Sequence, residues 1–213
     1  MKVNYLISIL LIAVMVSCST STKITGSWVE QGQTAPKEYK KIAVIALANK
    51  TSSQLTFERT FVDRLKYLGY DAIETSSFLV PSVVTKENAE MLDKLMKDRG
   101  VDGVIILSLL QVKDGVRYVP GSTPYTPGPY YGGGYYGYYN YNYNQMNSGY
   151  YEETTSIFLE SNFYDLNSVK LLSSIQTETA DPSGVDDLAL SYSSTILKKL
   201  IADKVLANNS LSK

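Results

Sequence analysis

Two largely apolar runs constrain the fold of this chain more than any other feature. The first, KKIAVIAL at 40–47, begins with two lysines, and the second, VDGVIILSLLQV, occupies 101–112. Runs of this length rich in β-branched residues predict strands buried on both faces of a sheet. Two segments with helical spacing and a short strand lie between them, so the predicted order is β-α-β-α-β. Right-handed crossovers then give an α/β fold with a parallel or mixed core sheet, or an α+β fold as the alternative.

The intervening helices are predicted from apolar spacing and from their boundaries. The first spans 52–68, with Ser52 and Ser53 available as caps and Gly69 after its end. Its apolar side chains recur at helical spacing: Leu55, Phe61, Leu65 and Leu68. A short strand is predicted at 70–75. A second helix is predicted from residue 85 to Gly100, where the glycine stops it.

The C-terminal half predicts antiparallel pairing and a closing helix. Asp114 and Gly115 are a turn signal, expected to end the second buried strand and to precede a short extended piece. Residues 154–165 and 170–179 flank the turn sequence DLNSVK and predict a hairpin. A last helix follows residue 182, and Ser183 with Asp186 resembles a capping box at its start. Helices packed on a mixed sheet complete the predicted single domain.

The first residues predict an export signal followed by a lipid anchor. Lys2 precedes an apolar run from Leu6 to Val16, which is too short to cross a bilayer of ~30 Å as a helix. The sequence MVSCS places a serine before Cys18 and resembles the lipobox of bacterial lipoproteins, although Met15 departs from the usual leucine. That resemblance implies removal of residues 1–17 and acylation of Cys18 with fatty acids such as palmitate. The alternative is a conventionally cleaved export signal.

The domain organisation follows from these boundaries. Residues 18–23 are expected to be a lipidated tether, 24–207 a single domain with an insert at 120–151, and 208–213 a frayed tail. Lipid on Cys18 holds the chain at a membrane. The residue after Cys18 is Ser19, which favours the outer membrane, and no acidic cluster follows, which favours its periplasmic face.

Composition excludes several kinds of chemistry. Cys18 is the single cysteine and the chain has no histidine, which removes Ser-His and Cys-His catalysis and zinc sites built on those residues. Loss of residues 1–17 leaves 19 basic and 21 acidic side chains, a balance of −2 that does not suit nucleic acid. Asp102 is expected at a strand-entry turn. Asp181, Asp186 and Asp187 are expected to favour a helix start, with calcium as the minor alternative. No catalytic residue, metal or cofactor is predicted.

The insert at 120–151 is the candidate binding segment. Eleven of the 18 tyrosines lie between 125 and 151, among glycine, proline and asparagine, and no Leu, Ile or Val falls between Gly121 and Ser156. Such a segment cannot build a core of its own, so one interpretation is an irregular loop. A second is a contact surface, because tyrosine combines contact area with a hydrogen-bonding hydroxyl. A third is self-association through the alternating YYNYNYN. The candidate binding residues are Tyr130, Tyr131, Tyr135, Tyr136, Tyr138, Tyr139, Tyr141 and Tyr143.

The order of elements resembles a group of envelope lipoproteins. The phrases KKIAVIAL, LGYDAIE, RGVDGVIILSLL and YDLNSVKLL, behind a lipobox, are similar to the N-terminal domain of the translocation protein TolB. They are also similar to the curli-secretion lipoproteins and to the lipoprotein activators of penicillin-binding proteins. The resemblance covers about 40–205 without the insert, and no catalytic motif accompanies it. It implies a binding or assembly role in the periplasm.

The sequence therefore predicts a lipid-anchored, non-catalytic binding or assembly module of the cell envelope. Its expected partners are the membrane and an envelope protein or glycan. One alternative is a structural subunit of a homo-oligomeric envelope or secretion assembly. The other is a carboxylate-dependent hydrolase, for which no paired carboxylate motif is found.

Overall fold

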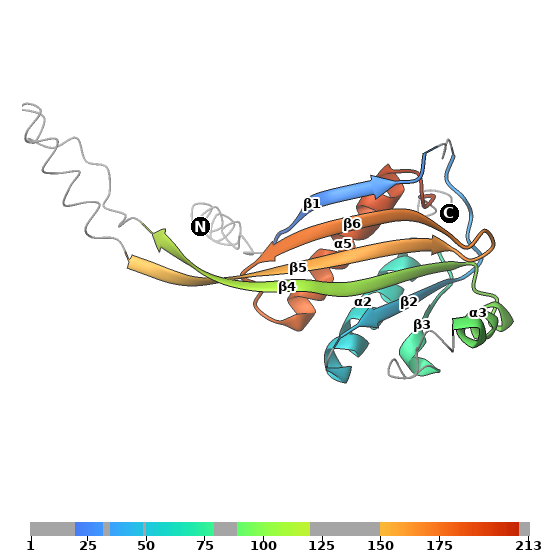
Figure 1. Ribbon diagram of the computed structural model, residues 1–213, viewed down its shortest axis with the longest axis horizontal. Coiled ribbons are helices and arrows are strands. Elements are labelled where there is room, and N and C mark those ends of the chain that lie inside the picture. Colours follow the sequence, from blue (N-terminus) through green and yellow to red (C-terminus); the bar gives the residue numbers. More distant parts are fainter. Residues whose placement is uncertain (1–19, 32–34, 49, 79–88, 120–149, 209–213) are drawn as a thin grey trace, which may run out of the picture.

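The computed structural model describes residues 20–31, 35–48, 50–78, 89–119 and 150–208. It confirms the predicted fold class. A mixed six-stranded sheet with the order β1-β6-β5-β4-β2-β3 carries helices on its faces (Figure 1). The elements are β1 Thr22–Val29, β2 Ile42–Leu47, α2 Thr51–Tyr67, β3 Ala72–Glu74, η1 Thr75–Ser77, α3 Ala89–Asp98, β4 Gly103–Val119, β5 Tyr150–Asp165, β6 Lys170–Ala180 and α5 Val185–Ala202.

The two predicted buried strands are the parallel centre of the sheet. β2 pairs in parallel with β3 on one side and with β4 on the other. Its residues alternate between two cores, since Ile42 and Val44 pack beneath α2 and α5 while Ala43 and Ile45 pack with Met96 of α3. Burial on both faces explains why the run is apolar without alternation.

The other half of the sheet is antiparallel. The predicted hairpin is confirmed as β5 and β6, and β5 also pairs along the whole length of β4. β1 adds an antiparallel edge strand beside β6, which the sequence analysis did not predict. Thr22 and Lys23, assigned to the tether from sequence, are the first residues of this strand. Its half-exposed residues and an irregularity between Ile24 and Gly26 weaken the alternation by which strands are recognised.

Two local predictions are wrong. Asp114 and Gly115 form no turn, because they lie inside β4 opposite Thr155 and Thr154. The interruption in β4 is instead a register shift between Leu109 and Gln111, after which the strand continues to Val119.

The start of α5 also differs from the expected capping box. Gly184 is the N-cap and makes no side-chain cap bond. The backbone N–H and the hydroxyl of Ser183 both donate to the carboxylate of Asp187, at 3.1 and 2.9 Å, rather than to Asp186.

Gly103 is required where β4 begins. A Cβ atom there would lie 2.9 Å from Cδ1 of Tyr39 and 3.1 Å from Cζ of Phe163. The rings of Tyr39 and Phe163 meet edge to face with centroids 5.0 Å apart, so neither ring can move away without breaking the contact.

We therefore expect Gly103→Ala to lower the free energy of unfolding by about 1–3 kcal/mol, the usual range for overpacking a core. Gly26→Ala is the matched control, since its Cβ would have 3.7 Å to its nearest neighbour, the Gln176 side chain. Urea denaturation of both variants measures the difference. Equal stabilities would contradict the close packing of Tyr39 on Gly103.

Candidate functional site: an apolar cavity at the root of a β-arm

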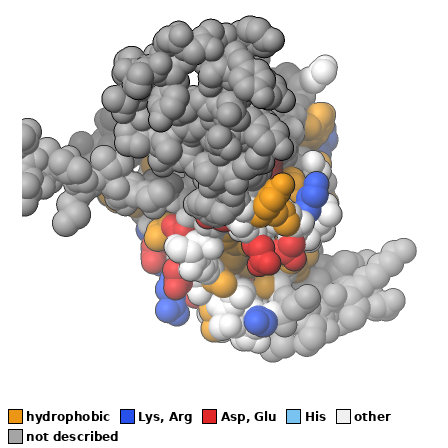
Figure 2. Space-filling model, turned by 90° about the vertical axis from the view of Figure 1, so that its left-hand side faces the viewer, with side chains coloured by type: hydrophobic (Ala, Val, Ile, Leu, Met, Phe, Trp, Pro, Cys, Tyr) orange, Lys and Arg blue, Asp and Glu red, His pale blue; other side chains and the backbone are white. Residues whose placement is uncertain are grey.

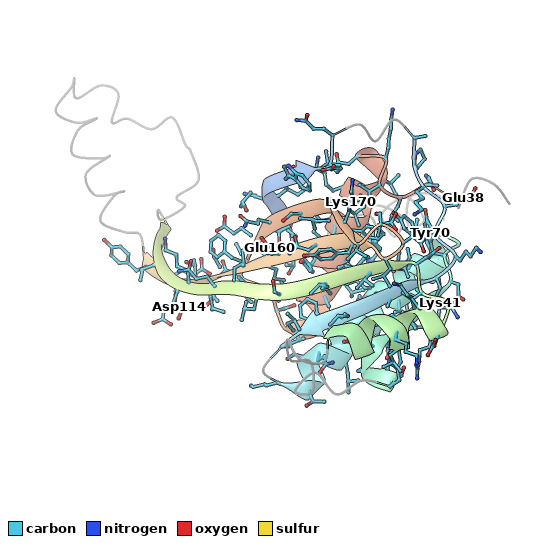
Figure 3. All side chains as sticks on the ribbon, turned by 45° about the vertical axis from the view of Figure 1, so that its right-hand side comes forward. Glu38, Lys41, Tyr70, Asp114, Glu160 and Lys170 are labelled. Carbon is cyan, nitrogen blue, oxygen red and sulfur yellow. The ribbon has the colours of Figure 1, made fainter. Side chains whose placement is uncertain are left out.

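Strands β4 and β5 extend beyond the rest of the sheet as a two-stranded ribbon. β2 stops pairing with β4 at Ser108, and β6 stops pairing with β5 at Ser156. We call residues 114–119 and 150–155 the β-arm; it projects from one end of the molecule and leads into residues 120–149 (Figure 1). Asp114 lies out on this arm, whereas Glu160 lies on the body of the sheet (Figure 3).

The β-arm exposes apolar side chains beyond the neighbouring strands. The ladder of β2 with β4 ends at Ser108 and that of β6 with β5 ends at Ser156, and the N–H and carbonyl of Thr155 bond to Asp181 instead. Val116 and Tyr151 are 66% and 74% exposed. An isolated two-stranded ribbon is marginally stable in water, and unpaired strand edges are templates for pairing with another chain.

A cavity of about 500 Å³ lies at the root of the β-arm, between the sheet, the start of α2 and the start of α5. Its floor consists of buried side chains of α2, α5, β4 and β5. These are Phe57, Leu107, Leu159, Leu188 and Tyr192.

Tyr192 contributes its ring to the cavity, not its hydroxyl. The hydroxyl is 2.7 Å from the Ser161 hydroxyl, and the ring meets Phe57 edge to face with centroids 6.0 Å apart. Burial raises the pKa of Tyr192 well above its ordinary value and outweighs the opposing effect of the Ser161 hydrogen bond. The side chain therefore stays neutral at physiological pH.

The rim of the cavity is also apolar, although it meets solvent. Four of its side chains are between 41% and 49% exposed: Leu47, Leu109, Val112 and Val185. The polar residues of the lining are Lys50, Ser53 and Ser108, and no carboxylate is among the described residues that line it. This largely apolar floor and rim suit an apolar ligand or partner.

A buried carboxylate fixes one wall of the cavity. Glu58 of α2 is fully buried, and its Oε1 accepts hydrogen bonds from the Ala46 N–H at 3.1 Å and the Thr75 hydroxyl at 3.0 Å. Gln54 Nε2 donates to the same oxygen, and the Ser76 N–H donates to Oε2 at 2.8 Å. These bonds tie α2 to the end of β2 and to η1, so they set the separation of two cavity walls.

Glu58→Gln should therefore destabilise the protein by about 2 kcal/mol, because the new amide N–H would face the N–H of Ser76 and a charge-assisted bond would be lost. Thermal unfolding measures the change. Asp63→Asn on the exposed side of α2 is the control and should have a near-neutral effect. An unchanged stability for Glu58→Gln would show that the network does not hold α2 in place.

The described chain begins at the same end of the molecule. Thr20 donates a hydrogen bond to the carboxylate of Asp187, and the Ser191 hydroxyl donates to the Thr20 carbonyl at 2.9 Å. Hydrogen bonds from Thr20 and Ser183 lower the pKa of Asp187. Register places Thr22 opposite Thr179, which in turn lies opposite Ile157 at the cavity. Figure 2 looks onto this end, where hydrophobic side chains are exposed among acidic ones.

The residues singled out from sequence are only partly placed. Cys18 and the eight candidate tyrosines, Tyr130 to Tyr143, lie outside the described residues. Asp102 is at the expected strand-entry turn, where its carboxylate accepts the backbone N–H groups of Lys40 and Lys41, each at 3.0 Å. Asp181 accepts the Thr155 N–H at 2.7 Å. In the part of the chain that the structure describes, no three acidic, His or Cys side chains gather into a metal-binding group.

Sequence analysis missed the cavity, because its lining comes from both central strands, β5 and two helices. One signal was present. The apolar pattern of β4 continues through Leu109 and Val112, past the end of its neighbour β2 at Leu47. A strand that outruns its partner while staying apolar exposes a hydrophobic surface.

No protein-family model matches the sequence, and no curated protein matches it. Within the described residues, no helix has the length and apolar character needed to span a membrane. Two structures of a PelC dodecamer from Paraburkholderia phytofirmans are similar, with TM-scores of 0.45 and 0.44 and 11% identity, over 84% of this chain and 95% of that one.

Two further solved structures are similar at lower scores. Lipoprotein GNA1162 from Neisseria meningitidis has a TM-score of 0.37 and 12% identity, over 76% of this chain and 98% of that one. A protein described as a neuraminyllactose-binding hemagglutinin homolog from Helicobacter pylori has a TM-score of 0.37 and 12% identity, over 87% and 98%. The neighbours thus include a lipoprotein and a dodecamer, but likeness at this level supports no inference about what this chain binds.

Proposed function

We propose that this chain is a lipid-anchored, non-catalytic module of the cell envelope that captures a partner at the end bearing the β-arm. The observation that carries the proposal is the β-arm itself, a ribbon that extends past its neighbours β2 and β6 and exposes Val116 and Tyr151. A two-stranded ribbon of this kind gains stability when another chain covers it. The partner is an envelope protein or a glycan, contacted by the β-arm and the tyrosines of the insert.

Anchoring would orient this end toward the membrane. Cys18 is two residues before Thr20, which is hydrogen bonded to Asp187 at the start of α5. Two residues of chain reach at most about 7 Å, so the proposed lipid would enter the membrane beside the root of the β-arm. The proposed location is the periplasmic face of the outer membrane.

Self-assembly is the second candidate function, and the same extended ribbon favours it. A strand edge that accepts a partner's backbone can accept that of a second copy, and head-to-tail contacts of this kind close into rings or extend into filaments. The cavity lining, by contrast, offers no carboxylate for the alternative of a hydrolase among its described residues.

Cys18→Ser should release the protein from the membrane fraction and abolish its labelling by a radioactive fatty acid. A single acyl chain gives only marginal binding, so stable anchoring depends on the full lipid group. Cell fractionation and metabolic labelling measure both effects. Ser17→Ala serves as the control, since it keeps a small residue before the cysteine. Persistence of the serine variant in the membrane fraction would contradict lipid anchoring.

A photo-crosslinking residue at position 116 of the β-arm should capture an envelope component in intact cells. The control is position 169, in the hairpin turn at the opposite end, where Val169 is 75% exposed and Val116 is 66% exposed. A capture specific to position 116 supports the binding function when the product is another molecule.

A product of twice the chain's own mass favours self-assembly instead. The same adducts at both positions, or none at position 116, would refute the β-arm as the contact surface. Mass spectrometry of the purified adducts distinguishes these results.

A further inference from the structure

We propose that the cavity at the root of the β-arm binds a single-chain amphiphile with an anionic head group, such as a fatty acid. The proposal goes beyond the binding of an envelope partner by the β-arm and does not depend on it. It rests on the shape, the lining and the charge of the cavity.

The size and lining of the cavity fit an alkyl chain. Its volume of about 500 Å³ falls in the roughly 300–1,000 Å³ range of small-molecule sites. Phe57, Leu107, Leu159 and Leu188 form an apolar floor whose side chains are each less than 10% exposed. The half-exposed apolar rim leaves a way in from solvent.

The lining favours an alkyl chain over a peptide. A peptide backbone entering the cavity would bring N–H and C=O groups into a space where Lys50, Ser53 and Ser108 are the polar residues. Unpaired backbone groups in an apolar site are costly, whereas methylene groups have no hydrogen bonds to satisfy. The Tyr192 hydroxyl is engaged with Ser161 and so offers nothing to a peptide.

The charge at the rim favours an anionic head group. Lys50 is the charged residue of the lining, and it stands at the N-terminus of α2. The first turn of α2 holds no acidic side chain, and no side-chain cap bond neutralises its positive end. Ser53 adds a hydroxyl at the same place. A carboxylate head group would meet Lys50 while its chain lies over the cavity floor.

The test uses the mature chain carrying Cys18→Ser, without detergent, so that no other acyl chain is present. Titration with cis-parinarate, a naturally fluorescent fatty acid, should show saturable binding of one molecule per chain. Lys50→Glu should weaken binding about tenfold or more, since it replaces a charge-assisted contact by repulsion. It should leave the binding of the corresponding uncharged fatty alcohol unchanged.

Two further variants localise the site. Val112→Asp places a carboxylate on the half-exposed rim and should also weaken cis-parinarate binding, while circular dichroism confirms that the fold is retained. Lys66→Glu makes the same charge change at the far, exposed end of α2 and should bind like the parent.

Three results with the purified protein would overturn the proposal. The first is a lack of saturable binding by the Cys18→Ser chain, and the second is equal binding by the Lys50, Val112 and Lys66 variants. The third is binding only after removal of residues 121–149, which would identify the insert as the occupant. In cells, a photoactivatable fatty acid should crosslink to cavity residues without being attached to Cys18. If the crosslinked fatty acid is also attached to Cys18, the cavity holds the chain's own lipid, and the proposal of a free ligand is overturned.

Discussion

The pairing of β4 with β5 is the interaction on which the rest of the structure depends. β4 is parallel to β2 on one edge and antiparallel to β5 on the other, so it joins the α/β half of the sheet to the hairpin half. Gly103 begins this strand beneath the rings of Tyr39 and Phe163, and the register set there carries through to Val119 opposite Tyr150. A slip of one residue would exchange Ile105 and Leu107, which face one core, with Val104 and Ile106, which face the other. The two helical layers therefore fix the register of the ribbon that extends beyond them.

The same pairing places the cavity, the β-arm and the start of β1 at one end of the molecule. β2 stops at Leu47 and β6 at Ala180, whereas β4 and β5 continue past them, and the cavity lies where the strands end. β1 enters at this end through Thr20 and Thr22, so the first described residues lie close to the exposed ribbon. The opposite end of the molecule is held by a charged contact. There Lys37 donates to Asp165, whose carboxylate also accepts backbone N–H groups of the hairpin turn.

The fold was predictable wherever local pattern and tertiary burial agree. The run at 42–47 is apolar because both faces are covered, and the helix at 51–67 shows its apolar stripe because one face meets the core. Asp114 and Gly115 misled because a turn signal is local, whereas their opposition to Thr155 and Thr154 depends on a strand some 40 residues away in sequence. β1 could not be predicted from the sequence for a similar reason. An edge strand gains its stability from hydrogen bonds to β6 and needs little hydrophobic alternation of its own.

The candidate site was less predictable than the fold, since no single segment of sequence contains it. Leu47, Val112, Ile157 and Val185 are each ordinary apolar residues in their own elements, and only the unequal strand lengths bring them to a common, solvent-facing rim. Half-exposed side chains of this size lose hydrophobic stabilisation that full burial would give, about 25 cal/mol per Å² of apolar surface. Glu58 adds a second cost, because a carboxylate is desolvated to hold α2 against the end of β2. A rim that stays apolar in water is a poor arrangement for stability alone. It is the arrangement expected if the ligand proposed for the cavity covers the rim.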